Sequence, residues 1–116
     1  MADPSCIFCR IAAGEIPSEI VYGSETVVAF RDTDPKAPTH VLLIPREHIA
    51  SLAEIRERHG PMLAEMARAA SDLARSEGID ESGWRLVTNV GPGAGQSVFH
   101  LHLHLLGGRP MTWPPG

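Results

Sequence analysis

Three histidines alternate with leucines near the C-terminus, in the run His100-Leu101-His102-Leu103-His104. Successive side chains of a β-strand point to opposite faces, so a strand here would place all three imidazoles on one face and the leucines on the other. Alternate residues of a strand lie about 6.6–6.8 Å apart, which lets neighbouring rings share a substrate or a metal ion. Because a strand gains no stability from three such rings, the pattern predicts a working face that the leucines anchor in the core.

Two kinds of chemistry fit such a face. A neutral imidazole is a nucleophile and a proton carrier near pH 7, which suits attack on a phosphorus or acyl centre. Imidazoles also bind zinc, which would activate a water molecule instead. A merely solvated polar face is the weaker interpretation, because polarity alone does not require three identical titratable groups. The residues themselves leave the first two possibilities open.

A glycine-rich segment, residues 89–97, lies directly before the histidines. Three glycines within five of its residues let the backbone approach a ligand closely, and exposed N–H groups there can hold phosphate oxygens. The side chains of Asn89, Gln96 and Ser97 add further polar groups. Alone, such a segment is more often an ordinary connection, but its place beside the histidines favours an anion site.

A nucleotide would need two further features, which the sequence offers ambiguously. Asp32 begins a loop, where its carboxylate can accept hydrogen bonds from ribose hydroxyls or simply initiate a turn. Several apolar side chains can line a slot for a base or belong to the core, and periodicity does not separate these roles. They are Ile7, Phe8, Ile11, Phe30 and Ile44.

The two cysteines, Cys6 and Cys9, form a single C-x-x-C pair. Zinc requires two more ligands, for which His40, His48 and His100 are candidates. Two free structural cysteines are the alternative, since an isolated C-x-x-C is a weak signal.

The elements that must position these residues follow from periodicity. Apolar residues at helical spacing predict a short helix over residues 6–13 and a long one over residues 60–76. Apolar and β-branched runs predict five strands, over residues 19–22, 26–31, 40–45, 84–89 and 98–106. Short connections and one long helix favour an α+β fold with a mainly antiparallel five-stranded sheet. We expect one domain over residues 1–116, with residues 107–116 as a C-terminal tail.

Composition limits the partners. The 116 residues carry a formal net charge of −4, which argues against a nucleic-acid polymer as ligand but leaves room for a small nucleotide. No apolar run approaches the ~20 residues of a membrane span, and the N-terminus lacks the basic and apolar regions of a signal peptide. We therefore expect a cytoplasmic protein with no membrane partner. His59 lies in a charged stretch and is expected to be solvated.

The chain resembles the histidine triad (HIT) superfamily, and the Hint branch in particular. The resemblance rests on His100-Leu-His-Leu-His-Leu-Leu, on Gly95-Gln96-Ser97-Val98, on Ala37-Pro38-Thr39-His40 and on the tail GGRPMTWPPG over residues 107–116. It spans about residues 6–116. It implies a HIT-like sheet that continues across a homodimer, and a purine nucleoside phosphoramidase or related nucleotide hydrolase.

By its place in the motif, His102 would attack the α-phosphorus, form a nucleotidyl-histidine intermediate and release an amine. Water would then release AMP or GMP. The resemblance implies catalytic or helper roles for His100, His104 and Ser97, and an orienting role for His40. It assigns nucleotide contacts to Asp32, Asn89, Gly95, Gln96, Ser97, Val98, His102 and His104, and the base pocket to Ile7, Phe8, Ile11 and Phe30.

Two features depart from the pattern of the branch. Thr33 stands where relatives usually carry an aliphatic residue beside the base, which weakens the expected purine preference. The second feature is the cysteine pair, which animal members lack. Cys6 and Cys9 resemble the zinc pair of bacterial relatives, in which the other ligands correspond to His48 and His100. This resemblance implies a structural zinc that is not required for the chemistry. A nucleotide-binding scaffold with vestigial catalysis and a zinc-dependent hydrolase are the alternative functions.

Overall fold

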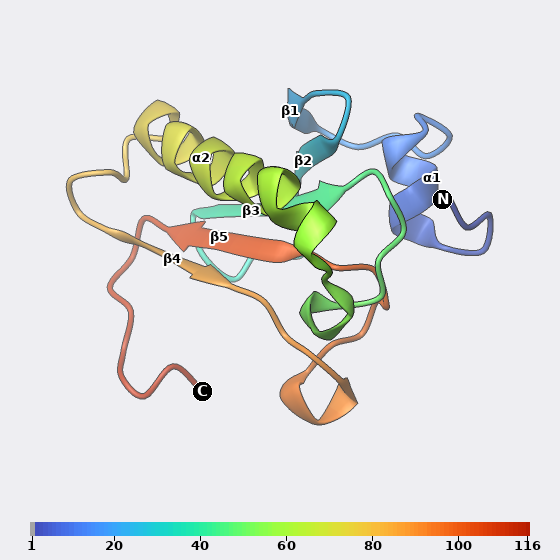
Figure 1. Ribbon diagram of the computed structural model, residues 1–116. Helices are drawn as coiled ribbons and strands as arrows, with labels where there is room; N and C mark the ends of the chain where they lie inside the picture. Colours follow the sequence, from blue (N-terminus) through green and yellow to red (C-terminus); the bar gives the residue numbers. More distant parts are fainter. Residues whose placement is uncertain (1) are drawn as a thin grey trace.

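The computed structural model describes residues 2–116, which form a five-stranded sheet with one long and one short helix (Figure 1). The strand order is β1-β2-β3-β5-β4, and every neighbouring pair is antiparallel. The expected α+β fold is therefore confirmed, with a sheet that is wholly antiparallel. No helix within residues 2–116 is both long and apolar enough to cross a membrane.

The elements lie close to their expected positions. The helices are α1 (Ile7–Ala12) and α2 (Gly60–Ser76). The strands are β1 (Ile20–Gly23), β2 (Val27–Arg31), β3 (Thr39–Pro45), β4 (Trp84–Val87) and β5 (Leu103–Gly107). Short 3₁₀ turns occupy Leu52–Glu54, Glu57–His59 and Pro92–Ala94.

The sheet buries both of its faces, because β2 and β3 send alternate side chains to two separate cores. One set, which includes Val41 and Leu43, packs with α2, and Leu103 and Leu105 of β5 join this core. The other set, which includes Phe30 and Leu42, packs with α1. Burial on both faces explains why β3 is an uninterrupted apolar run. The α1 face carries the histidine rings, since Phe8 of α1 contacts His102.

The last strand is shorter than predicted. We expected a strand over residues 98–106, but β5 begins at Leu103, so His100 and His102 precede it. The antiparallel partner β3 pairs with β5 only as far as Leu43↔Leu103. Before that point the backbone bonds elsewhere, for example from the Leu101 N–H to the Ile49 carbonyl at 2.6 Å. The leucines still point into the core, where Leu101 and Leu105 are almost completely buried.

His59 is buried, and the expectation that it is solvated was wrong. Its Nδ1 accepts a hydrogen bond from the Arg56 N–H at 2.9 Å, and its Nε2 lies 3.4 Å from a Glu47 carboxylate oxygen. The ring therefore closes the 3₁₀ turn that leads into α2. The charged neighbourhood in sequence did not reveal this, because Glu47, which lies 12 residues earlier, meets the ring only after the chain has turned.

Gly108 gives a test of the turn that leaves β5. Its φ is +89°, and an added Cβ would lie 2.9 Å from the Cβ of Pro38. A left-handed conformation costs a non-glycine residue on the order of 1–3 kcal/mol, so Gly108→Ala should lower the free energy of unfolding by about that amount. Urea denaturation measures it. Gly93→Ala is the matched control, because no atom lies within 4 Å of its added Cβ; equal losses in both variants would contradict this account of the turn.

Candidate functional site

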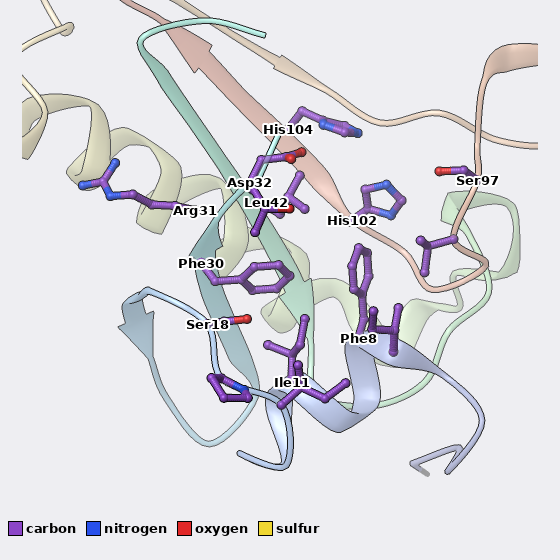
Figure 2. Close-up of a pocket in the computed structure, with 15 residues that line it drawn as sticks. Phe8, Ile11, Ser18, Phe30, Arg31, Asp32, Leu42, Ser97, His102 and His104 are labelled. Carbon is purple, nitrogen blue, oxygen red and sulfur yellow. The ribbon is translucent and has the colours of Figure 1, made fainter. Parts of the chain in front are cut away.

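A cavity of about 320 Å³ lies between α1 and the sheet, and Figure 2 shows the side chains around it. Segments far apart in the sequence meet there: α1, the turn at residues 16–18, the end of β2, and the segment from Ser97 to His104. One half is apolar and the other polar. Predicted site residues in its lining are Ile7, Phe8, Ile11, Phe30, Asp32, Ser97, Val98, His102 and His104.

The apolar half is built from aromatic and aliphatic side chains of the α1 core. Phe8 and Phe30 meet edge to face, with ring centroids 5.5 Å apart. Both are almost fully buried, so they belong to the core and also form a wall of the cavity. The two roles that the sequence left open are therefore held by the same residues. A flat apolar ligand is the kind of group this half accommodates.

His102 presents an unprotonated nitrogen in the polar half. Its Nδ1 lies 2.7 Å from the main-chain carbonyl oxygen of His100. A carbonyl only accepts, so Nδ1 carries the proton of the neutral ring and Nε2 keeps its lone pair. The edge of the His102 ring is also held by Phe8, at a centroid distance of 5.1 Å. The geometry thus fixes the tautomer in which His102 is a nucleophile.

His104 has the opposite tautomer, which a chain of hydrogen bonds imposes. The Lys36 main-chain N–H donates to His40 Nδ1 at 3.0 Å, so the His40 proton resides on Nε2. His40 Nε2 then donates to His104 Nδ1 at 2.9 Å, which places the His104 proton on Nε2. Among residues 2–116 that buried Nε2 has no hydrogen-bond partner. Because the His104 ring lines the cavity, this unsatisfied donor is a candidate partner for an anionic oxygen of a ligand.

Burial keeps the rings of His40 and His104 neutral. It lowers the pKa of His104 to about 4, and the neighbouring His102 and His40 lower it further. Burial also lowers the pKa of His40, although the carboxylate of Asp32 acts against this. At neutral pH each ring therefore carries one proton, as the hydrogen-bond chain requires.

The hydrogen bonds from Lys36 through His40 to His104 also argue against a catalytic metal at Asp32, His40 and His104. Asp32, His40 and His104 offer ligand atoms within 4.8 Å of one another. A metal at His40 Nε2 would drive the ring proton to Nδ1, where the Lys36 N–H already donates. Two donors would then face each other, which costs the desolvated groups a hydrogen bond. The arrangement fits a hydrogen-bonded relay better than a metal site.

The glycine-rich segment contributes unequally to the cavity. Ser97 and Val98 line it, whereas Asn89 lines a neighbouring cavity of about 240 Å³ together with Asp32, His40 and His104. Gly95 has a φ of +94° and lines neither of these two cavities.

Gln96 is directed into the protein. Its buried side chain accepts from the Gly91 N–H and donates to the carbonyls of Ala50 and Val98. In this geometry Gln96 shapes the glycine-rich segment and does not line the cavity.

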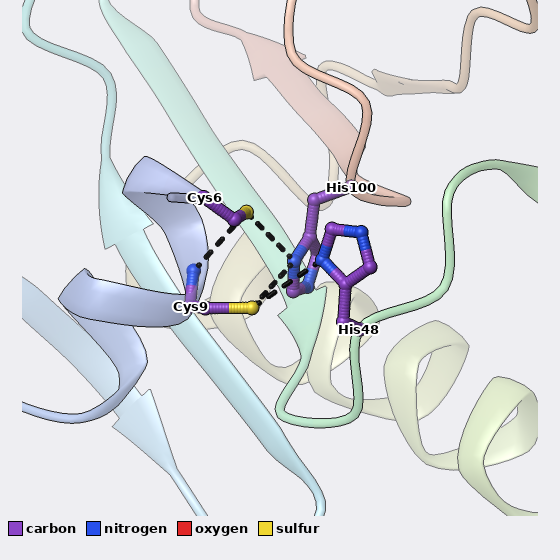
Figure 3. Close-up of side chains that lie close together, drawn as sticks. All are labelled: Cys6, Cys9, His48 and His100. Atoms are coloured by element: carbon purple, nitrogen blue, oxygen red, sulfur yellow. Dashed lines mark hydrogen bonds between the residues drawn. The ribbon is translucent and has the colours of Figure 1, made fainter. Parts of the chain in front are cut away.

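Four residues predicted as zinc ligands, Cys6, Cys9, His48 and His100, lie together beside α1 (Figure 3). The Cys6 Sγ is 3.3 Å from His100 Nδ1, and the Cys9 Sγ is 3.4 Å from His48 Nδ1 and 3.5 Å from His100 Nδ1. Tetrahedral zinc with bonds of about 2.3 Å to sulfur and 2.0 Å to nitrogen separates such ligands by about 3.5 Å. The distances therefore fit a Cys₂His₂ site.

The surroundings of the four ligands also fit zinc. The His100 Nε2 donates to the Pro45 carbonyl at 2.8 Å, which turns the lone pair of Nδ1 toward the thiols. Burial lowers the pKa of His100 to about 4, so that ring is neutral as a metal ligand must be. The Cys9 N–H donates to the Cys6 Sγ. Zinc here would tie α1 to the segment that carries His102.

Some lining residues were not foreseen. Ile16, Pro17 and Ser18 form one rim of the cavity, and Leu42 forms part of its floor. The turn at residues 16–18 has no periodicity that marks it, and Leu42 looked like ordinary strand core. The role of the Lys36 amide was also missed, because no side-chain pattern identifies a backbone donor.

Removal of zinc should destabilise the protein. A ligand that binds only the folded state adds about 2.7 kcal/mol when its free concentration is 100 times the Kd. We expect a chelator to lower the Tm of the wild type, and added zinc to restore it. In His48→Gln the chelator should have little further effect. A wild-type Tm that does not respond to chelator, with zinc content measured in parallel, would contradict a structural metal.

The buried histidines make stability depend on pH. The folded-state pKa of His104 is lowered from 6.5 to about 4, so between these values the unfolded state binds more protons. The free energy of unfolding should therefore fall as the pH is lowered from 6.5 toward 4. Urea titrations at several pH values test this, and His104→Gln should show a shallower fall. Parallel curves for the two proteins would show that His104 does not contribute.

The comparisons with known proteins agree with this geometry. Residues 5–113 match the family model described as "Scavenger mRNA decapping enzyme C-term binding". The chain is 49% identical over 116 residues to a "14 kDa zinc-binding protein" of Zea mays, covering 98% of this chain and 90% of that protein. It is 47% identical over 105 residues to "Purine nucleoside phosphoramidase" of Escherichia coli K12, covering 90% and 88%.

A solved structure gives the same result for the fold. The HIT family hydrolase from Legionella pneumophila superposes with a TM-score of 0.94 and 52% sequence identity, covering 97% of this chain and 100% of that one. The prediction of a zinc cofactor is confirmed by the four-ligand cluster together with the zinc-binding maize relative. On the sequence, the fold and the relatives together, the chain belongs to the histidine triad superfamily.

Proposed function

We propose that this protein is a hydrolase that cleaves the P–N bond of purine nucleoside phosphoramidates. The observation that carries the proposal is the pair of opposite tautomers: an unprotonated Nε2 on His102 and an unpartnered Nε2–H on His104 in one cavity. One nitrogen supplies a nucleophile and the other a donor for the phosphoryl oxygen. The E. coli relative named purine nucleoside phosphoramidase supports the substrate class.

The cavity suggests how a nucleotide binds. The base fits the apolar half beside Phe8 and Phe30, and the ribose hydroxyls fall near the carboxylate of Asp32. The α-phosphorus then lies among His102, His104 and Ser97. Thr33 also borders the cavity, so an adenine or guanine base would meet a hydroxyl-bearing side chain there.

The reaction would proceed in two displacements. The lone pair of His102 Nε2 forms a bond to the α-phosphorus while the bond to the amine breaks, and the leaving nitrogen takes a proton from solvent. Water then attacks the same phosphorus and returns a proton to solvent, the P–Nε2 bond breaks, and a nucleoside monophosphate leaves. The His104 Nε2–H holds a phosphoryl oxygen through both steps, and Ser97 contacts the leaving group. Splitting the hydrolysis in this way replaces one difficult step with two easier ones.

In this mechanism zinc has no chemical step. Held by Cys6, Cys9, His48 and His100, it would supply rigidity and keep the His100 carbonyl in place.

A homodimer, in which a sheet edge continues across the interface, is also part of the proposal. The outer edge of β4 has no partner strand among residues 2–116. A cytoplasmic location also stays a prediction.

A binding protein without turnover is the second candidate. It would bind the nucleotide in the same cavity and would differ from the hydrolase only in that the nucleotidyl-histidine intermediate does not form. A single experiment on the nucleophile separates the two functions.

His102→Ala should abolish release of AMP from adenosine 5′-phosphoramidate. Loss of a covalent nucleophile lowers kcat by at least about 10³-fold in comparable active sites. Turnover by the wild type is measured by AMP release, and the intermediate by the mass of a nucleotidyl group on His102. His59→Gln is the control, because it changes a buried histidine outside the cavity.

Each other outcome has a definite meaning. A folded wild type that binds AMP without turnover would favour the binding protein. Turnover that persists in His102→Ala would show that another group is the nucleophile. Turnover that disappears completely and reversibly on chelation, in a protein that stays folded, would favour the zinc-dependent hydrolase.

A further inference from the structure

His100 joins the zinc ligands to the nucleophile through its two ends. Its ring lies 3.3 Å from the Cys6 Sγ and 3.5 Å from the Cys9 Sγ. Its main-chain carbonyl accepts the 2.7 Å hydrogen bond that fixes the His102 tautomer. The ring and the carbonyl belong to the same residue, and the His100 side chain is completely buried. A change at the sulfur atoms therefore acts, through His100, on the carbonyl that orients His102.

Helix α1 makes a second connection between the same two places. It carries Cys9 and is capped by Cys6, whose sulfur accepts from the Cys9 N–H. Between them stands Phe8, which contacts the rings of His100 and His102 and lines the cavity. A shift of α1 would therefore reach the cavity through Phe8 as well.

Each sulfur-bearing residue borders a cavity of its own. Cys6 lines an open cavity of about 370 Å³ beside Ser5, His48 and Phe99. Cys9 lines another of about 140 Å³. Both cysteines are buried, so these two cavities are the routes by which a small oxidant would reach them. The two Sγ atoms also lie within 4.8 Å of each other, so the pair is placed to form a disulfide once one sulfur is oxidised.

We propose that Cys6 and Cys9 are a redox modification site, at which a peroxide converts the zinc-bound thiolates to a disulfide and thereby displaces His102 from its catalytic orientation. The Cys6 thiolate attacks hydrogen peroxide and becomes a sulfenic acid, with release of hydroxide. The Cys9 thiolate then attacks that sulfur, forms the S–S bond and releases a second hydroxide. Two protons convert the hydroxides to water, the two thiolates are oxidised, the peroxide is reduced, and zinc leaves.

Loss of the metal removes what holds the His100 ring against α1. The disulfide draws Cys6 and Cys9 together and leaves His48 and His100 without their shared partner. The carbonyl of His100 is then less firmly placed, and so is the hydrogen bond to His102 Nδ1. The activity arm of this inference rests on the proposed function, whereas the oxidation and the metal release do not.

The test starts from zinc-loaded, reduced protein treated with hydrogen peroxide. Free thiols, released zinc and kcat with adenosine 5′-phosphoramidate are followed together, well below the Tm of each form. We expect one zinc released per disulfide and a fall in kcat of about 10- to 100-fold, the usual effect of losing a partner that orients a site residue. Dithiothreitol with added zinc should restore kcat.

Cys6→Asp provides a matched variant that cannot form the disulfide. Aspartate is a good N-cap for α1 and a carboxylate ligand for zinc, so it replaces both roles of Cys6. Its kcat, compared with its own value before treatment, should respond much less to peroxide than that of the wild type. An equal response in both proteins would overturn the proposal, since oxidation elsewhere would then be responsible.

Two further results would also overturn it. One is complete disulfide formation and zinc release with an unchanged kcat. The other is a thiol pair that does not form a disulfide. If the reduced protein releases no AMP, the proposed function fails separately. The coupling is then read from the rate at which diethyl pyrocarbonate modifies His102, and a rate that oxidation leaves unchanged overturns the inference.

Discussion

The hydrogen bond from His102 Nδ1 to the carbonyl of His100 is the interaction on which the site depends. It decides which nitrogen of His102 faces the cavity with a lone pair. The carbonyl is in turn held because the His100 side chain is bonded to the Pro45 carbonyl on one side and lies against the thiols on the other. The candidate zinc site therefore supports the proposed nucleophile His102 through His100, although none of the four ligands lines the cavity between α1 and the sheet.

Burial also keeps the imidazoles of His40 and His104 neutral. A protonated His104 would carry a proton on Nδ1 as well, and that nitrogen then could not accept from His40. The lowered pKa of His104 and the backbone amide of Lys36 thus support the same arrangement from two directions. A neutral imidazole has one donor nitrogen and one acceptor nitrogen. The proton position on one ring therefore determines the proton position on the ring to which it is hydrogen-bonded. The side chains alone would not determine the tautomers of His40 and His104, since the series of hydrogen bonds begins at the Lys36 main-chain N–H.

Much of the fold followed from the sequence, because periodicity reports which face of an element is buried. The long helix and the first four strands lay close to where the apolar pattern predicted them. The C-x-x-C pair alone left His40, His48 and His100 open as further zinc ligands, and the choice of His48 and His100 came from the resemblance to bacterial relatives. Tertiary contacts between unrelated turns were not accessible in this way. His59 was buried by Arg56 and Glu47, and the turn at residues 16–18 closed the cavity, without any pattern that marked either one.

The strand that we predicted over residues 98–106 begins only at Leu103, and this difference bears on how His102 is oriented. An ideal strand over residues 98–106 would have sent its carbonyls to neighbouring strands. Instead β3 ends at Pro45, whose carbonyl accepts from the His100 ring, and the Thr88 hydroxyl donates to the carbonyl of His102. The His100 carbonyl is then free to accept from an imidazole. The candidate site lies where the pairing of β3 with β5 ends, because the His100 carbonyl there is available to orient the His102 ring.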